Sequence, residues 1–392
     1  MQDVWPVQSN PMPMGAAAAG RLRLLFFSDA IASRNGVGSY YADLVAHLKD
    51  HVAHAELVSP GSDTADYVHE LTFPLPGDPT QRVYLPLVGR VWEKVKTVAP
   101  HGIVIPTPGP YGLLGFLMAR YLGIPICAGY HTRYEKLTDL YWRSAFSGVS
   151  RIYMKWLNRL FFRSSSRVVA NSGEMIREAA RDGAIHAEMI GTPIARTFLA
   201  PPFPPLSSDL RSVCYAGRLA LEKNIRDVLD AARALPHIRF TIAGDGPLRG
   251  EVAACAAQAS NIEYVGWVSR QGVASVMDRA DMLLLPSEVE AFGTIALEAM
   301  ARRRLVLVSG SCGILNWPDL APGVYAMDSG ESLTDAVSRI ASLPYEERRQ
   351  KADTAHAAAR AFNEQTIGQW LALFDSICLK QGQFRQHAKK AV

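Results

Sequence analysis

The stretch DMLLLPSEVEAFGTIALEAMA, residues 281–301, contains a change of pattern that decides the fold. Residues 282–285 form a short apolar run closed by a proline, which is typical of a buried strand. The part after Gly293 is rich in Ala, Leu, Glu and Met, and it predicts a helix. Glu290 is therefore expected in a strand-to-helix loop, and Glu298 about two turns further along the chain.

A helix that begins after such a loop offers free backbone N–H groups and a partial positive charge, which together favour anions. Carboxylates on either side of it can accept hydrogen bonds from sugar hydroxyls. A ligand that carries both phosphate and sugar suits this arrangement. The alternative is a loop glutamate and a helix glutamate without a ligand. The residues expected to contact the ligand here are Glu290, Ala291, Phe292, Gly293, Thr294 and Glu298.

Length and composition describe a globular protein with more than one domain. The chain has 392 residues, which favours two domains. Its longest apolar runs, such as Leu24–Phe27, are much shorter than the roughly 20 residues of a membrane span. The formal net charge of +4 is too small to indicate a nucleic-acid partner, and we expect none.

The first 20 residues contain an Ala-rich run but no basic segment followed by an apolar core. We therefore expect a disordered leader over 1–20 rather than a signal peptide. Cysteine spacing shows no C-x-x-C pattern, so neither a zinc site nor a disulfide framework is indicated, and a cytoplasmic location fits. The five cysteines are Cys127, Cys214, Cys255, Cys312 and Cys378.

Strand-like and helix-like segments alternate along the chain, which is the signature of parallel α/β sheets. Helices are expected over Tyr40–Lys49 and Leu113–Leu122. The first series of expected strands is Arg23–Phe27, His54–Val58, Gly102–Ile105, Ile124–Ala128 and Arg167–Ala170. The second series is Val213–Ala216, Arg239–Ala243, Ile262–Val265, Met282–Leu285 and Leu305–Val308.

A proline cluster separates the two series, and clustered prolines disfavour both helix and strand. We interpret residues 198–210 as the linker between two domains. A helix over 364–380 follows the second series, and Trp370 and Phe374 are expected to anchor it. The predicted organisation is a first domain over 21–197, a second over 211–363, that helix, and a basic tail over 381–392.

Two glycine-containing loops follow strands of the second series. In AGRLALEKN, residues 216–224, Arg218 and Lys223 lie at the carboxyl end of a strand, where open α/β sheets bind ligands, so two cations there can neutralise a diphosphate. The alternative is a pair of solvated cations. We also expect tight turns or backbone approaches to the ligand at Gly217, Gly244, Gly246 and Val268.

The first series contains two further candidates. Gly36, Val37 and Gly38 lie between the first strand and the first helix, where glycine permits close backbone approach and the helix N-terminus favours phosphate. His131 follows another apolar strand, and its imidazole can hydrogen-bond a ligand or move a proton. A plain helix entry and a structural histidine are the alternatives.

Residues 141–172 contain no Asp or Glu but many cations and aromatic residues. Four of the cations recur every four residues, which places a positive stripe on one side of a helix. Such helices lie well on anionic membranes, whereas the alternative is a packed helix with solvated cations. The residues expected to face a membrane or an acceptor are Arg133, Arg143, Arg151, Lys155, Trp156, Arg159 and Arg163.

Glu290 and Glu298, with their neighbouring residues, resemble the E-x7-E motif of the retaining glycosyltransferases of family 4. The loop with Arg218 and Lys223 is similar to the Gly-Arg-x-x-x-x-Lys loop of the same family. The resemblance implies the GT-B fold, an α/β architecture of two Rossmann-like domains facing across a cleft, with a C-terminal helix that crosses back to the first domain. It covers most of residues 21–380.

In that family the first glutamate contacts the donor sugar and the second holds the ribose. The Arg and Lys hold the diphosphate, and the His lies near the sugar and phosphate. The resemblance therefore implies catalytic roles for His131, Arg218, Lys223 and Glu290, and donor-binding roles for the glycine loops and Glu298. Glycine loop 36–38 reads Gly-Val-Gly where the family has Gly-Gly, so the contacting amide stays open.

The partners implied are a nucleotide sugar and an acceptor. No Asp-x-Asp motif is present, so we expect no metal and no other cofactor. The His-Thr pair at His131 and the basic stretch look most similar to enzymes that glycosylate diacylglycerol or phosphatidylinositol, which implies a lipid acceptor and peripheral association with the cytoplasmic face of the inner membrane. A lipopolysaccharide, capsule or polysaccharide intermediate is the alternative acceptor. The sequence leaves the oligomeric state open.

Two other classes of protein were weighed. A nicotinamide-dependent oxidoreductase needs G-x-G-x-x-G after a strand and an acidic residue about 20 positions further on, and neither half contains this pattern. A non-catalytic nucleotide-sugar or lipid-binding protein fits the fold. The presence of Glu290, Glu298, Arg218 and Lys223 together argues against it.

Overall fold

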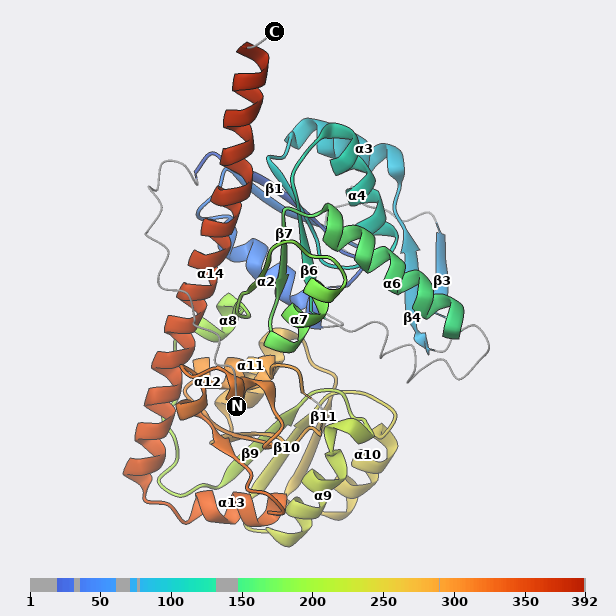
Figure 1. Ribbon diagram of the computed structural model, residues 1–392. Helices are drawn as coiled ribbons and strands as arrows, with labels where there is room; N and C mark the ends of the chain where they lie inside the picture. Colours follow the sequence, from blue (N-terminus) through green and yellow to red (C-terminus); the bar gives the residue numbers. More distant parts are fainter. Residues whose placement is uncertain are drawn as a thin grey trace. The chain divides into compact units, whose positions relative to one another are not determined.

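A computed structural model describes residues 20–31, 36–60, 71–75, 78–131, 147–288 and 290–390. The chain forms two compact units, of which unit 1 comprises 1–191 with 365–392 and unit 2 comprises 192–364 (Figure 1). The predicted leader, apart from its last residue, lies outside the described residues. Among the described helices, none is long and apolar enough to cross a membrane.

Unit 1 is built on a six-stranded parallel sheet with the order β2-β1-β5-β6-β7-β8. The sequence predicted five of these strands and missed β8, as well as a separate antiparallel hairpin of β3 and β4. The strands are β1 (Arg23–Phe27), β2 (His54–Val58), β3 (Leu71–Leu75), β4 (Asp78–Leu85), β5 (Gly102–Ile105), β6 (Ile126–Tyr130), β7 (Arg167–Ala170) and β8 (Ala187–Met189).

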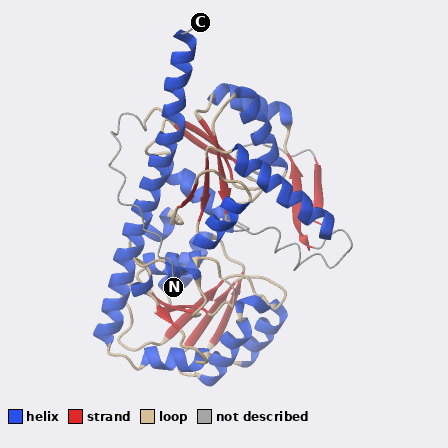
Figure 2. Ribbon diagram, viewed as in Figure 1, coloured by secondary structure: helices blue, strands red, loops and turns tan. Residues whose placement is uncertain are grey.

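Helices connect the parallel strands of unit 1 (Figure 2). The helix predicted from Tyr40 begins four residues earlier, so Gly36–Gly38 form its first turn rather than a preceding loop. The helices of this unit are α2 (Gly36–Leu48), α3 (Val88–Val98), α4 (Pro110–Leu122), α6 (Ser147–Ser164) and α7 (Gly173–Arg181).

Unit 2 also contains a six-stranded parallel sheet, with the order β11-β10-β9-β12-β13-β14. In chain order this is 3-2-1-4-5-6, the order of the Rossmann fold. The strands are β9 (Ser212–Ala216), β10 (Arg239–Ala243), β11 (Ile262–Gly266), β12 (Met282–Leu285), β13 (Leu305–Val308) and β14 (Tyr325–Ala326). The helices are α8 (Arg196–Leu199), α9 (Ile225–Ala234), α10 (Arg249–Gln258), α11 (Arg270–Asp278), α12 (Thr294–Ala301) and α13 (Leu333–Ala341), with short 3-10 turns η1 (Leu221–Lys223), η2 (Gly313–Asn316) and η3 (Ala321–Gly323).

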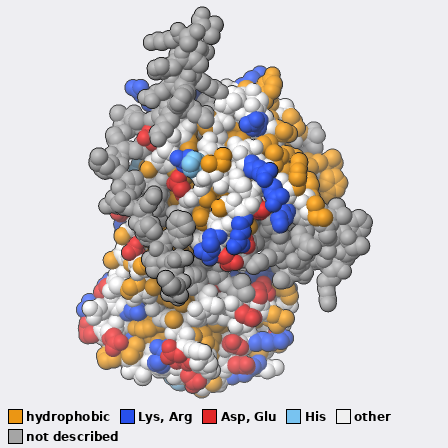
Figure 3. All heavy atoms as spheres, viewed as in Figure 1, with side chains coloured by type: hydrophobic (Ala, Val, Ile, Leu, Met, Phe, Trp, Pro, Cys, Tyr) orange, Lys and Arg blue, Asp and Glu red, His pale blue; other side chains and the backbone are white. Residues whose placement is uncertain are grey.

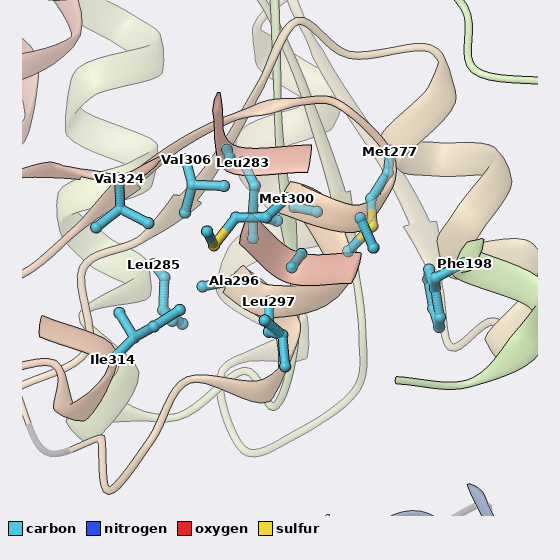
Figure 4. Close-up of a cluster of buried hydrophobic side chains, with 14 of the residues drawn as sticks. Phe198, Met277, Leu283, Leu285, Ala296, Leu297, Met300, Val306, Ile314 and Val324 are labelled. Atoms are coloured by element: carbon cyan, nitrogen blue, oxygen red, sulfur yellow. The ribbon is translucent and has the colours of Figure 1, made fainter. Parts of the chain in front are cut away.

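The sheet of unit 2 is covered on both faces, which explains why its strands are apolar without interruption. Alternate residues of β12 enter opposite cores: Leu283 and Leu285 pack on one face, and Met282 and Leu284 on the other. Figure 4 shows the first of these cores, in which Leu297 and other side chains of α12 pack beside the strand residues. The burial of α12 fixes the helix whose first turn follows the Glu290 loop.

The last helix, α14 (Tyr345–Lys390), belongs to both units. Its predicted start at residue 364 is wrong, because the helix begins at Tyr345, and the predicted tail over 381–392 continues this helix to Lys390. Ala355 and Phe362 pack in the core of unit 2, whereas Trp370 and Phe374 are buried in the core of unit 1. The two aromatic side chains that were expected to anchor the helix do so.

The proline-rich segment predicted as a linker lies within unit 2, whose boundary with unit 1 falls between Gly191 and Thr192. Two buried arginines bind its carbonyl groups. Arg302 donates to the carbonyls of Ala200 and Pro202, each at 2.5 Å, and Arg304 donates to the carbonyl of Pro204. Because the prolines of this segment have no N–H, it contains few backbone donors, and the guanidinium groups donate to its carbonyls instead.

We expect Arg304→Met to lower the free energy of unfolding of the protein by about 3 kcal/mol, because it leaves buried carbonyl groups without donors. Arg304 is 1% exposed and also donates to the carbonyls of Ala280 and Arg302. Urea denaturation measures the change. The neighbouring Arg303→Met is the control: it breaks a half-exposed ion pair with Asp353 and should cost less than about 1 kcal/mol. Equal losses in both variants would contradict the role assigned to Arg304.

Candidate functional site

The centre of the unit 2 sheet is a topological switch point, the place where ligands bind in open α/β sheets. The neighbouring strands β9 and β12 are parallel, so their carboxyl ends meet at one edge of the sheet. The loop 217–224 follows β9, and the loop 286–293 follows β12. These are the two loops in which the sequence placed the cations and the first glutamate.

The structure brings Lys223 and Glu290 together. Lys223 Nζ donates to Glu290 Oε2 at 2.7 Å, and both side chains are about a quarter exposed. Arg218, on the same loop as Lys223, is exposed. A cation and a carboxylate that meet at the carboxyl edge of the sheet can bind phosphate oxygens and sugar hydroxyls respectively.

Backbone contacts with neighbouring segments hold the Glu290 loop. Asn224 Nδ2 donates to the carbonyl of Pro286 at 2.9 Å, and Gly313 N donates to the carbonyl of Glu290 at 2.9 Å. A Cβ at Gly313 would lie 1.9 Å from the carbonyl oxygen of Ala291, so only glycine fits there. These contacts use main-chain groups of the loop, and they leave the Glu290 carboxylate oriented toward Lys223.

The entry to α12 has the form expected of an anion site. Gly293 precedes the helix with a φ of 95°, which only glycine adopts readily, and Thr294 is the first helical residue. Ala291 is exposed, whereas Phe292 is buried against Trp317 and Phe362. Phe292 is therefore a core residue, and only its backbone is placed to contact a ligand at this position.

The second glutamate has a partner that the sequence analysis missed. Glu298 is 5% exposed, and its Oε1 accepts a hydrogen bond from Arg270 Nη2 at 2.5 Å. The Arg270 guanidinium also lies over the Phe198 ring, 5.5 Å from its centroid. Arg270 comes directly after the helix cap Ser269, and nothing in that local pattern indicates a partner 28 positions away.

The turn at Gly244 and Gly246 supports the cationic loop sterically. A Cβ at Gly244 would lie 1.8 Å from the carbonyl oxygen of Gly217, and one at Gly246 would lie 2.5 Å from that of Leu219. Both glycines have positive φ, 144° and 158°. The backbones of the two loops are in direct contact. These glycines therefore determine how closely the loop that carries Arg218 approaches the turn. Val268 is half-buried between β11 and α11.

In unit 1 the predicted glycines lie in the first turn of α2, where Gly36 is exposed, Val37 half-buried and Gly38 buried.

Asp29, which the sequence analysis missed, binds the N-terminal end of α4. Its carboxylate accepts hydrogen bonds from Thr107 Oγ1 and from the backbone N–H groups of Gly109, Tyr111 and Gly112 at the start of α4, at 2.7–3.2 Å. Burial raises the pKa of Asp29, and these hydrogen bonds oppose that shift.

His131 follows β6 in an aromatic setting. Its Nε2 lies 2.8 Å from the hydroxyl of Tyr41, and its ring lies against the tilted ring of Tyr40 at a centroid distance of 4.4 Å. Its Nδ1 is buried and has no hydrogen-bond partner among the described residues. Burial lowers the pKa of His131 to about 3, so the imidazole is neutral at physiological pH. His131 belongs to unit 1, and the two glutamates belong to unit 2.

The basic segment of the sequence forms α6. Leu157 and Phe161 are buried, as in an ordinary packed helix. The outward side nevertheless carries Ile152 and Trp156, 70% and 59% exposed, beside the exposed Lys155. Figure 3 shows basic and hydrophobic side chains gathered next to each other over this part of unit 1.

The cationic stripe on α6 is not uniformly solvated. Arg159 pairs with Asp182 at 3.3 Å, and the exposed Arg163 packs over Gly183. Of the other residues predicted to face a membrane or acceptor, Arg133 and Arg143 lie outside the described residues, and Arg151 is described only as part of the helix. The described residues contain no group of three or more metal-ligand side chains placed to hold an ion.

Two family models match the chain. The model described as Glycosyltransferase Family 4 matches residues 34–194, and the model described as Glycosyl transferases group 1 matches residues 201–355. Together they cover more than half of the chain. The first lies almost entirely in unit 1, and the second lies within unit 2.

Curated relatives are named as glycosyltransferases. Alpha-D-kanosaminyltransferase of Streptomyces kanamyceticus is 24% identical over 66% of this chain and 72% of its own length. A GDP-mannose-dependent phosphatidylinositol dimannoside mannosyltransferase of Mycobacterium tuberculosis is 34% identical over 35% of this chain and 37% of its own length. Alpha-monoglucosyldiacylglycerol synthase of Streptococcus pneumoniae is 27% identical over 51% of this chain and 49% of its own length.

Solved structures match nearly the whole chain. Sucrose-phosphate synthase of Thermosynechococcus elongatus aligns with a TM-score of 0.65 at 17% identity, over 95% of this chain and all of its own. The Anabaena protein HepE in complex with UDP-glucose aligns with a TM-score of 0.60 at 15% identity, over 91% of this chain and all of its own. With two Rossmann-like units, the matched family models and these structural likenesses, the chain belongs to the glycosyltransferases of family 4, which have the GT-B fold.

Proposed function

We propose that the enzyme transfers a hexose from a nucleoside-diphosphate sugar, with UDP as the expected nucleotide, to a membrane lipid such as diacylglycerol. The observation that carries the donor half is the Lys223–Glu290 pair at the switch point of unit 2, with Arg218 on the same loop. The diphosphate would bind Arg218, Lys223 and the N-terminus of α12, and the sugar hydroxyls would bind Glu290.

Glu298 is the proposed ribose-binding residue, and Arg270 is proposed to orient it. The hydrogen bond from Arg270 holds the Glu298 carboxylate, whose oxygens can accept hydrogen bonds from hydroxyl groups. The backbone of the 291–294 entry and the loop at Gly217 complete the donor site. Sugar specificity would then depend on the geometry of the Glu290 carboxylate, which Lys223 holds in place.

The proposed reaction forms a bond between an acceptor hydroxyl oxygen and the anomeric carbon while the bond from that carbon to the diphosphate oxygen breaks. The hydroxyl proton passes to the leaving diphosphate, attack comes from the same face, and the anomeric configuration is retained. Negative charge grows on the leaving diphosphate, so cations at Arg218 and Lys223 stabilise this transition state more than the ground state. No metal or other cofactor is part of this proposal.

His131 is proposed to contact the donor as a neutral hydrogen-bonding group. With its pKa near 3, it cannot supply a proton at physiological pH, so it can act by orienting an oxygen of the ligand. This assignment leaves the proton transfer to the leaving phosphate.

The acceptor half of the proposal rests on α6. Its exposed Ile152, Trp156 and Lys155 combine apolar and cationic groups on one side of a helix, which suits an anionic bilayer surface. Two relatives add support, since one is named a phosphatidylinositol dimannoside mannosyltransferase and the other a monoglucosyldiacylglycerol synthase. We propose a cytoplasmic enzyme that binds the inner membrane peripherally through this side of α6. A lipopolysaccharide, capsule or polysaccharide intermediate is the alternative acceptor.

The first experiment is turnover of UDP- and GDP-sugars by the purified protein, with and without anionic liposomes containing diacylglycerol. Free nucleotide and glycolipid are both measured. Glycolipid formed only with liposomes supports the proposal and identifies the donor. Nucleotide release without glycolipid moves the acceptor to a polysaccharide or another soluble substrate. Absence of release from every donor would favour a non-catalytic binding protein.

Glu290→Gln and Lys223→Gln should each lower kcat/KM by about 10²–10³-fold, because each removes a charge that acts on the donor as the glycosidic bond breaks. Glu288→Gln is the matched control, since this exposed glutamate lies on the same loop and contacts its neighbours through backbone groups. Steady-state kinetics with a saturating acceptor measure the effect. Full activity in either test variant would refute the site.

The pKa of His131 predicts a specific pH dependence of stability. Its folded pKa of about 3 lies below the unfolded value of about 6.5, so the unfolded state binds more protons as the pH falls through this window. The His131 contribution to stability is therefore complete above pH 6.5 and decreases toward pH 3. The free energy of unfolding, measured by urea denaturation at several pH values between 4 and 7, should rise less steeply with pH in His131→Gln than in the wild type. The same pH dependence of the free energy of unfolding in His131→Gln and the wild type would contradict the assignment.

Substitutions on the exposed side of α6 should weaken membrane binding. Lys155→Gln combined with Trp156→Ser should weaken binding to anionic liposomes by about tenfold or more, because it removes one cation and one aromatic group from the bilayer contact. The control replaces two exposed cations elsewhere in unit 1 by Gln: Lys49, in the turn after α2, and Arg120 of α4. Cosedimentation measures both. Equal binding by wild type and test variant would leave α6 as an ordinary solvated helix.

A further inference from the structure

His131 is held from two sides by consecutive residues of α2. The hydroxyl of Tyr41 lies 2.8 Å from Nε2, and the Tyr40 ring packs against the imidazole with 4.4 Å between the ring centroids and a tilt of 36° between the ring planes. Both tyrosines are buried. The edge and the face of the imidazole are thus fixed by one helix.

Tyr40 ties this arrangement to the rest of unit 1. Its hydroxyl donates to the carbonyl of Gly191 at 2.9 Å and accepts from Trp370 Nε1 at 3.0 Å. Through Tyr40, α2 is therefore hydrogen-bonded both to the backbone at Gly191 and to the helix α14. The Tyr41 ring also packs edge-on against Trp370 of α14, with 6.2 Å between the ring centroids, so both tyrosines are fixed by this helix.

The strand β6 contains a space that accommodates the Tyr41 hydroxyl. A Cβ at Gly129 would lie 2.0 Å from the Tyr41 hydroxyl oxygen, so a larger residue two positions before His131 would displace it. Glycine weakens a strand interior and often marks a close approach of another group. The Tyr41 hydroxyl fills the space that a side chain at position 129 would occupy.

The direction of the hydrogen bond between Tyr41 and His131 depends on the tautomer of the histidine. We assign the Tyr41 hydroxyl as the donor to Nε2, because a phenol is a stronger acid than a neutral imidazole N–H, and an imidazole nitrogen is a stronger base than a phenol oxygen. The ring hydrogen of neutral His131 then lies on Nδ1. That atom is buried and has no partner among the described residues, which is rare for a buried donor and requires an explanation.

We propose that Tyr41 is a positioning residue for the transfer reaction: it fixes the tautomer of His131 so that Nδ1–H is presented as a donor to an oxygen of the nucleotide sugar. This inference rests on the proposed function, because it assigns the ligand of that site. The first turn of α2 contains Gly36–Gly38, where the sequence predicts a phosphate contact. One rigid helix would thus carry the phosphate contact and set the orientation of the histidine.

The kinetic test is Tyr41→Phe, which removes the hydroxyl and keeps the ring. We expect kcat to fall about 10- to 100-fold, as when other second-layer hydrogen bonds are removed, with the donor KM changed by less than about threefold. Tyr111→Phe is the matched control, since the hydroxyl of Tyr111 is buried in the same unit and has no hydrogen-bond partner among the described residues. Its activity should equal that of the wild type.

A double variant tests whether Tyr41 acts through His131. If it does, Tyr41→Phe combined with His131→Ala should be no slower than His131→Ala alone, because the histidine that the hydroxyl orients is already absent. Multiplication of the two single effects would show that Tyr41 acts independently, and it would overturn the proposal. Gly129→Ala displaces the hydroxyl without removing it and should reproduce the loss of kcat of Tyr41→Phe.

A spectroscopic test does not depend on turnover. In protein labelled with ¹⁵N-histidine, the His131 signals, assigned by their loss in His131→Gln, should report hydrogen on Nδ1 and a bare Nε2 in the wild type. Tyr41→Phe should shift this population toward the Nε2–H tautomer. Hydrogen on Nε2 in the wild type, or the same signals in both proteins, would refute the positioning role. If no nucleotide sugar is turned over but the tautomer shifts as expected, the proposed function fails while the Tyr41–His131 contact stands.

Discussion

The pairing of β9 with β12 at the centre of the unit 2 sheet determines where the proposed donor-binding side chains lie. Two parallel strands that are adjacent in the sheet but distant in the chain end side by side, and their loops leave in opposite directions. The space between the loops receives a cation from one and a carboxylate from the other. The contact between Lys223 and Glu290, 67 positions apart, follows from this strand order.

The loops after β9 and β12 are held by neighbouring backbone segments. Few of their side chains are therefore needed for folding. The glycines at 244, 246 and 313 allow carbonyl groups to approach at distances that a Cβ would exclude. The arginines of the chain divide in a similar way. Arg302 and Arg304 are buried and bind main-chain carbonyls, whereas Arg218 is exposed at the carboxyl edge of the sheet. The number of cations in a sequence therefore says little about ligand binding until burial is known.

Much of this fold could be predicted from the sequence, because buried parallel strands are continuous apolar runs with glycine and proline at their ends. β1, β2, β10 and β12 were predicted with their observed bounds. The short edge strands β8 and β14 were missed, since β8 consists of three residues, two of them exposed, and carries no apolar run. The start of α14 was missed because its first turns contain charged residues and alanines without a clear apolar stripe.

The candidate site could be predicted only in part, for a related reason. Glu290, Lys223 and Arg218 stand in recognisable local patterns, and the strand order joins them. The partners of these and other groups come from elsewhere: Arg270 for Glu298, Tyr41 for His131, and Asp29 for the start of α4. Each of these contacts joins residues between 28 and 90 positions apart, and no local pattern encodes such a distance.

The composition of the unit 1 core has a consequence for synthesis of the protein. Ile367, Trp370, Phe374 and Ile377 are buried among residues of β1 and α2, yet they follow unit 2 in the chain. As the polypeptide leaves the ribosome, the sheet of unit 1 emerges before unit 2 but lacks these side chains until unit 2 has been made. Its apolar surface under α14 must stay uncovered while unit 2 is translated. Unit 1 thus begins before unit 2 and is completed after it.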